Sequence, residues 1–185
     1  MKRLISTLGV IIFVISLSFF LTSCADNPVG FSTGKPGIVN KGTQVKLLKW
    51  NDAFKQELLV KKGFAGKWVF PDKDATVGGK KTYNNSVFIP AGAVSEPTYV
   101  TVEVLGGEYA AVEFNPSMTF NKNVTITLSY AGVDLEDGSP YDLKPVWYNP
   151  DTGNWEYVNS PVTVNTEKQT ISFQTNHFSR YGWSW

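Results

Sequence analysis

The feature that most constrains the fold of this chain is an alternation of apolar and polar residues with a period of two. In residues 123–130 the apolar positions are Val124, Ile126, Leu128 and Tyr130. Because successive side chains of a β-strand point to opposite faces, this pattern predicts a strand with one face in a core and the other in water. Residues 98–105 repeat the pattern, with Val100, Val102 and Val104 on the apolar side.

Shorter runs of β-branched and aromatic residues continue along the chain. They lie at residues 87–89, 109–114, 146–148, 155–158, 162–164, 171–173 and 181–185. Pro90 ends the first run because proline has no amide proton to donate, and Pro150 and Gly153 indicate a hairpin turn. No convincing long helix separates these strands. The sequence therefore predicts an all-β fold, namely an antiparallel β-sandwich.

Residues 44–74 follow the alternation less closely. Residues 56–60 fit a turn of helix, but the run Leu58-Leu59-Val60, bracketed by charged residues and a glycine, also fits a strand. We favour strands in this region. Residues 44–74 are thus expected to add a pair of strands at one edge of the sandwich.

The amino terminus has the composition of a secretory signal. Lys2-Arg3 precedes an apolar run over residues 4–21 that is also long enough for an uncleaved membrane anchor. The next residues decide between the two, because Leu21-Thr22-Ser23-Cys24 resembles the lipobox of bacterial lipoproteins, in which the cysteine is acylated before cleavage. We therefore expect residues 1–23 to be a lipoprotein signal peptide and Cys24 to be the lipid attachment point.

Residues 24–43 are rich in glycine and proline and poor in apolar side chains, which is typical of a flexible tether. Removing residues 1–23 changes the balance from 17 basic and 16 acidic residues to 15 and 16, a net charge of −1. A surface without excess positive charge gives no reason to expect nucleic acid as a partner. We expect an extracytoplasmic protein of a bacterial cell envelope, held at a membrane through Cys24.

A set of separated motifs covers residues 75–185. They are Val77-Gly78-Gly79, the run I-P-A-G-A-V-S-E-P-T at residues 89–98, and residues 114–120, 124–130, 147–157 and 176–181. Together they resemble the ZU-five domain, the β-sandwich module of ankyrins, netrin receptors and zonula-occludens proteins. The resemblance implies a ZU-five-like sandwich over residues 75–185. It also implies a protein-interaction or scaffold role, since such modules mostly hold other proteins.

The last of these motifs contains His177-Phe178-Ser179. In some ZU-five domains this triplet cuts itself between Phe and Ser, so the resemblance brings in self-cleavage after Phe178 as an alternative function. The Ser179 hydroxyl would attack the Phe178 carbonyl, His177 would accept the proton, and water would open the ester. In the structural alternative, His177 ends a strand, Phe178 fills the core and Ser179 bonds to backbone. We favour the structural alternative.

Three aromatic residues, Trp147, Trp155 and Tyr157, are candidates for ligand binding. Trp147 and its neighbour Tyr148 must face opposite sides of their strand, so one of these two rings is a candidate for exposure. An exposed ring would stack on a sugar or anchor a partner protein, although sandwich cores also use tryptophan. A glycan-binding surface module is therefore a second alternative function.

Few residue patterns in the chain suit catalysis or metal binding. Acid and amide side chains cluster at residues 134–142 and 149–156, but without the spacing of an EF-hand loop, and solvated turns explain them. One histidine and one cysteine do not make a zinc site, and there is no Gly-x-Ser-x-Gly motif. We expect no cofactor, no metal and no turnover chemistry.

Overall fold

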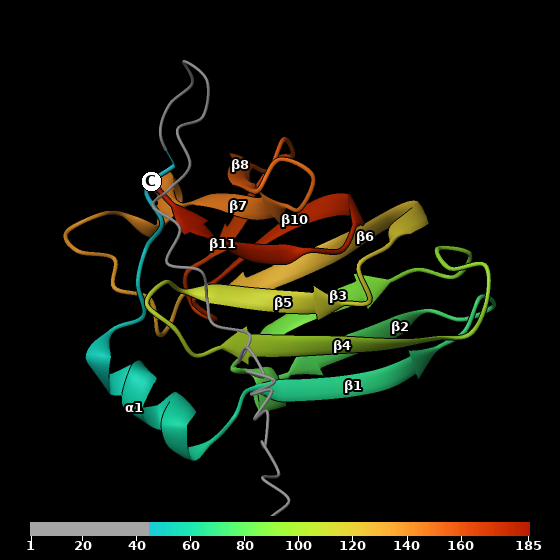
Figure 1. Cartoon of the computed structure of the whole chain (residues 1–185), viewed down its shortest axis with the longest axis horizontal. Coiled ribbons are helices and arrows are strands. Elements are labelled where there is room, and N and C mark those ends of the chain that lie inside the picture. Colours follow the sequence, from blue (N-terminus) through green and yellow to red (C-terminus); the bar gives the residue numbers. More distant parts are fainter. Residues whose placement is uncertain (1–44) are drawn as a thin grey trace, which may run out of the picture. The chain divides into compact units, whose positions relative to one another are not determined.

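A computed structural model describes residues 45–185, which form two packed antiparallel β-sheets and one α-helix (Figure 1). The six-stranded sheet has the order β1 (Phe64–Val69), β4 (Thr98–Leu105), β5 (Ala111–Asn115), β11 (Arg180–Ser184), β7 (Lys144–Asn149) and β8 (Asn154–Tyr157). The five-stranded sheet has the order β2 (Ala75–Gly79), β3 (Asn85–Ile89), β6 (Thr119–Ser129), β10 (Thr170–His177) and β9 (Thr163–Asn165). The predicted all-β sandwich is confirmed.

The remaining described elements are helix α1 (Asp52–Val60) and two short 3-10 helices, η1 (Lys80–Thr82) and η2 (Pro140–Asp142). The predicted signal peptide over residues 1–23, the predicted lipid attachment point Cys24 and the predicted tether over residues 24–43 lie outside the described residues.

The alternation in the sequence places the core between the two sheets. Val124, Ile126 and Leu128 of β6 are fully buried, whereas Thr125 and Thr127 on the other face are half-buried. In β4, Val100, Val102 and Val104 are the buried set. The buried side chains of β6 and those of β4 thus face one another between the two sheets, as the alternation with a period of two predicts.

The segment between β3 and β4 passes from the five-stranded sheet to the six-stranded sheet. β3 ends at Ile89, and the Ala91 amide then donates a hydrogen bond to Asp74 Oδ1 at 2.8 Å. Gly92 has a φ of 81°, a conformation that residues with a Cβ rarely adopt. The small-residue turn that begins at Pro90 is therefore what lets the chain change layers.

Residues 52–60 form helix α1, so the strand favoured for residues 56–60 is wrong. Asn51 caps this helix, because its Oδ1 accepts a hydrogen bond from the Phe54 amide at 2.8 Å. Leu58, one turn after Phe54, lies on the same face of the helix and is 8% exposed. The run Leu58-Leu59-Val60 was misleading because a short apolar run bracketed by charged residues fits a strand as well as a helix, while the cap and the packing of Leu58 favour the helix.

After the helix, β1 lies at one edge of the six-stranded sheet and pairs with β4 along its whole length. Residues 45–74 thus contribute one helix and one edge strand, where a pair of strands was expected over residues 44–74. The side chains of β1 alternate between the two faces of the sheet, since Val69 is buried and Trp68 is exposed.

Residues 45–50 close one end of the core against β11. The Leu48 amide donates to the Trp183 carbonyl at 2.9 Å, and the ring centroids of Trp50 and Trp183 lie 5.3 Å apart. Trp50 Nε1 donates to the Leu105 carbonyl at 2.9 Å. Both sheets and the core between them are built from residues 45–185, so this part of the chain supplies its own hydrophobic core.

The Asn51 cap gives a direct test of helix α1. Asn51→Ala removes the acceptor of the Phe54 amide and is expected to lower the free energy of unfolding by about 1 kcal/mol. Asn51→Asp keeps an acceptor at the same place and is expected to retain most of the stability. Urea unfolding followed by tryptophan fluorescence measures both variants. An equal loss in the two variants would contradict the capping role.

Candidate functional site

The turn between β10 and β11 carries the triplet His177-Phe178-Ser179, and Phe178 fixes this turn in the core. Phe178 is 2% exposed, and its ring centroid lies 4.5 Å from that of Phe120 and 5.6 Å from that of Phe114. Its amide donates to the Met118 carbonyl at 2.9 Å. The residue before the predicted scissile bond is therefore held by aromatic packing on two strands.

The polar groups around the Phe178–Ser179 peptide bond are engaged by neighbouring segments. Ser179 Oγ donates a hydrogen bond to the Tyr148 carbonyl, and the Ser179 carbonyl accepts from the Phe114 amide at 3.1 Å. The Phe178 carbonyl accepts from Ser117 Oγ at 3.3 Å. The hydroxyl that would attack the Phe178 carbonyl thus donates to β7 instead.

His177 is half-buried at the end of β10. Its ring lies edge-on to that of Trp147, with 4.4 Å between the centroids, and its Nδ1 is 3.1 Å from Thr175 Oγ1. Burial lowers the pKa of His177, which keeps the imidazole neutral at neutral pH. Its carbonyl accepts a hydrogen bond from the Tyr181 hydroxyl at 2.8 Å. Within residues 45–185, no hydrogen bond connects the His177 ring to Ser179.

A small open hollow of about 200 Å³ lies beside this peptide bond. Its lining includes Ser117, Tyr148, Ser179 and the ion pair of Arg180 with Glu113, whose nitrogen and oxygen are 3.1 Å apart. Ligand pockets usually have volumes of about 300 Å³ or more, so this hollow is small for an organic ligand.

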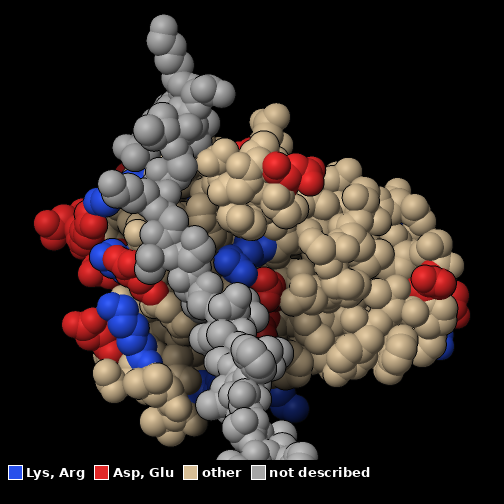
Figure 2. All heavy atoms as spheres, viewed as in Figure 1, with Lys and Arg blue, Asp and Glu red and all other residues tan. Residues whose placement is uncertain are grey.

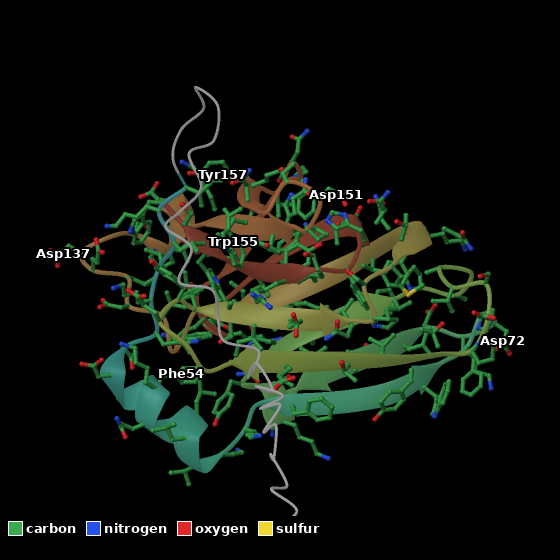
Figure 3. The ribbon with its side chains drawn as sticks, in the orientation of Figure 1. Phe54, Asp72, Asp137, Asp151, Trp155 and Tyr157 are labelled. Atoms are coloured by element: carbon green, nitrogen blue, oxygen red, sulfur yellow. The ribbon has the colours of Figure 1, made fainter. Side chains whose placement is uncertain are left out.

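The hairpin of β7 and β8 places two of the three candidate aromatics on one face. Trp155 pairs with Tyr148, with ring centroids 5.8 Å apart, and Tyr157 pairs with Val146, so Trp155 and Tyr157 share a face (Figure 3). Because a Cβ at Gly182 would stand only 3.5 Å from the Trp155 ring, that ring lies over Gly182 of β11. This is the outer face of the six-stranded sheet.

Trp147 lies on the other face of β7. It pairs with Tyr181, which is fully buried, and its ring packs on His177. The structure therefore brings Trp155 and Tyr157 together with Tyr148, and separates Trp147 from them. Sequence reasoning required Trp147 and Tyr148 to face opposite sides, and the pairing with β11 decides which of the two faces outward.

Sequence reasoning did not identify a second aromatic group, at the opposite edge of the six-stranded sheet. Trp68 of β1 pairs with Tyr99 of β4, and their rings meet edge-on with 5.5 Å between the centroids. Trp68 is 56% exposed and Tyr99 is 46% exposed, and Phe64 on the same face of β1 is also exposed. The alternation of residues 98–105 already placed Tyr99 on the polar side, but only strand pairing shows that Trp68 joins it.

The acid and amide clusters organise turns in the structure. Asp134 Oδ1 accepts from the Glu136 amide at 3.0 Å, and Glu136 pairs with Lys46 at 2.9 Å. In the β7–β8 turn, Asn149 Nδ2 donates to Glu156 Oε1 at 2.8 Å. Within residues 45–185, no group of three or more His, Cys, Asp or Glu side chains is placed to hold a metal ion.

Comparisons with known proteins leave the family open. No protein-family model matches the chain, and no curated protein matches it either. Among the helices of residues 45–185, none is both long and apolar enough to cross a membrane. The fold, the His177–Ser179 turn and the two aromatic groups are therefore the observations from which function must be inferred.

We predict that the Phe178–Ser179 bond stays intact. The Ser179 hydroxyl donates to the Tyr148 carbonyl and His177 Nδ1 contacts Thr175, so no hydrogen bond from Ser179 to His177 prepares the proton transfer that cleavage needs. Mass spectrometry of the purified protein under denaturing conditions, after prolonged incubation, is expected to return the uncleaved mass. A product lacking Ser179–Trp185 that disappears in Ser179→Ala would contradict this prediction.

His177 is expected to make the stability of the fold depend on pH. Because burial lowers its pKa in the folded state, the unfolded chain binds the proton first as the pH falls through 6.5. The free energy of unfolding should therefore be constant above about pH 7.5 and decrease below about pH 6.5. His177 is the one histidine of the chain, so urea unfolding of His177→Gln should show a smaller decrease over the same range. An unchanged decrease would assign the effect to other groups.

Proposed function

We propose that this protein is a lipid-anchored protein of a bacterial cell envelope whose ZU-five-like sandwich holds another protein and has no turnover chemistry. The observation that supports this most is the exposed Trp68–Tyr99 pair on the edge of the six-stranded sheet. Acylated Cys24 would fix the chain to the membrane, and residues 24–43 would give the sandwich reach. Binding would then occur on the sandwich itself.

The Trp68–Tyr99 pair has the composition of a binding hot spot. Tryptophan and tyrosine contribute much of the free energy at protein interfaces, because large rings bury area at a low cost in side-chain entropy. Phe64 and Phe70 are also exposed, at 47% and 44%, so the pair does not stand alone. Contiguous exposed apolar surface of this kind marks interaction sites on soluble domains.

The position of β1 adds a second reason to expect a protein partner. β1 pairs with β4 on one side, and among the described strands none pairs with its other side. An extended segment of a partner would find backbone donors and acceptors there, next to the aromatic rings. Edge pairing would contribute affinity, and the Trp68–Tyr99 pair would contribute selectivity.

Figure 2 views the outer face of the six-stranded sheet. Charged side chains, in blue and red, meet near the middle of this face, and uncharged atoms, in tan, cover most of its right-hand part. In Figure 1 the ends of β1 and β4 that carry Trp68 and Tyr99 lie on that same right-hand side. A partner that binds here would meet few charges to desolvate.

Substitution at Trp68 tests the proposal. Trp68→Ala is expected to weaken capture of the partner from an envelope extract about thirtyfold, which corresponds to about 2 kcal/mol for a hot-spot residue. Phe88→Ala is the matched control, because Phe88 is 41% exposed but lies on β3 of the other sheet. A photoreactive phenylalanine at position 68, and not at position 88, should crosslink to one protein. Equal effects of both substitutions would contradict the assignment.

A glycan-binding surface is the second candidate, supported by Trp155, Tyr157 and Tyr148 on the other half of this face. Rings on a common face would stack on a sugar, and the ion pair of Arg180 and Glu113 would offer hydrogen bonds beside them. The same extract separates the two candidates. Competition by free sugar and sensitivity to Trp155→Ala would favour the glycan, whereas sensitivity to Trp68→Ala alone favours the protein.

A further inference from the structure

Helix α1 ends in two aliphatic side chains that the core does not use. Val60 is 91% exposed and Leu59 is 80% exposed, more than any other large hydrophobic residue that the structure describes. Phe54 and Leu58 face the sandwich, and Leu59 and Val60, one and two positions further round the helix, therefore face away from it. These two residues form a protruding apolar tip at the end of α1.

Two pairs of lysines border this tip. Lys61 and Lys62 follow it directly, and Lys80 and Lys81 lie in η1; all four are exposed. Tyr83, which follows η1 in the chain, connects this segment to the end of α1. Its hydroxyl donates to the Lys61 carbonyl at 2.7 Å, and Lys61 Nζ lies 5.5 Å from its ring centroid.

Few acidic side chains oppose these four lysines. Asp52 of α1 pairs with Lys55 at 3.0 Å. Glu57 lies close to Tyr83, and it raises the pKa of that phenol less than burial does. Glu103 lies opposite Phe64 at the start of β1. The four lysines outnumber the two carboxylates of Glu57 and Glu103. This end of the sandwich therefore carries a local positive charge next to exposed aliphatic surface.

We propose that this end of the domain docks on an anionic phospholipid surface, with Leu59 and Val60 in the boundary between headgroups and acyl chains and the lysines at the phosphates. Leucine and valine beside lysine clusters are the combination that interfacial lipid binding uses. Protein hot spots are built instead around aromatic residues and arginine, and nucleic acid would use the lysines but not the aliphatic tip. The docking does not depend on acylation of Cys24.

The proposed lipid face is compatible with partner binding elsewhere on the sandwich. In Figure 1, α1 lies at the lower left, and β1 begins near the middle of the view and runs away from α1 toward the right-hand side. Trp68 lies four residues along β1 from Phe64, about 14 Å at the usual rise of a strand. A sandwich seated on lipid by the α1 tip would therefore keep Trp68 and Tyr99 open to a partner.

Vesicle binding by residues 45–185 tests the proposal, since this unit contains both sheets and their core. Binding is expected on vesicles of phosphatidylcholine with added phosphatidylglycerol and not on phosphatidylcholine alone, and it should weaken as salt screens the lysines. Replacing Lys61 and Lys62, or Lys80 and Lys81, by glutamine should weaken binding about thirtyfold. Lys168→Gln, an exposed lysine in the β9–β10 turn, is the matched control and should bind normally.

The tip itself needs a separate variant, because lysines alone would attract any anionic surface. Leu59→Ser with Val60→Ser removes exposed apolar atoms only, so the fold should be unchanged while binding falls. Residues 45–185 contain no cysteine. The thiol introduced by Val60→Cys can therefore be labelled with a polarity-sensitive dye at that position alone. Its emission should shift to shorter wavelength on anionic vesicles, whereas a dye at Tyr141→Cys should not shift. Equal binding to neutral vesicles, or anionic binding that ignores Leu59, Val60 and the lysine pairs, would overturn the proposal.

Discussion

The burial of β11 in the middle of the six-stranded sheet is the constraint on which the rest of this sandwich depends. β11 is the last strand of the chain, yet it lies between β5 and β7, and Tyr181 and Trp183 are fully buried. Trp183 meets Trp50, which comes from the first described segment. The two ends of residues 45–185 therefore complete the same core. Such long-range pairing costs loop-closure entropy, which the burial of β11 in the core must offset.

The same burial explains why the His177–Ser179 turn is held as it is. β10 belongs to one sheet and β11 to the other, so the turn between them crosses the core, and Phe178 fills the crossing. Once that ring is fixed, the neighbouring polar groups must find partners on the segments beside it. Ser179 donates to β7, and the His177 carbonyl accepts from Tyr181. The triplet His177-Phe178-Ser179 thus serves as a corner of the core.

Three groups of apolar side chains outside the core lie at an edge of the six-stranded sheet or at the end of a helix. Trp68 and Tyr99 lie at the β1 edge of the six-stranded sheet, Trp155 and Tyr157 lie at its β8 edge, and Leu59 and Val60 lie at the end of α1. No further strand of the described chain covers these places. The architecture therefore offers three separate apolar surfaces. The two aromatic surfaces suit a protein or a sugar, whereas the aliphatic surface of Leu59 and Val60, with lysines nearby, suits lipid.

The sequence by itself determined that residues 98–105 and 123–130 are half-buried strands and that the fold is an antiparallel sandwich, because side-chain alternation is a local property of the chain. It did not determine helix α1, since a short apolar run such as Leu58-Leu59-Val60 fits either a helix or a strand, and the Asn51 cap and the packing of Leu58 favour the helix. Nor did it determine that Trp147 turns inward and Tyr148 outward, or that Trp68 meets Tyr99. A local pattern gives a strand two unlike faces. Which strand lies beside it, and which side each ring then occupies, depends on contacts between residues far apart in the chain.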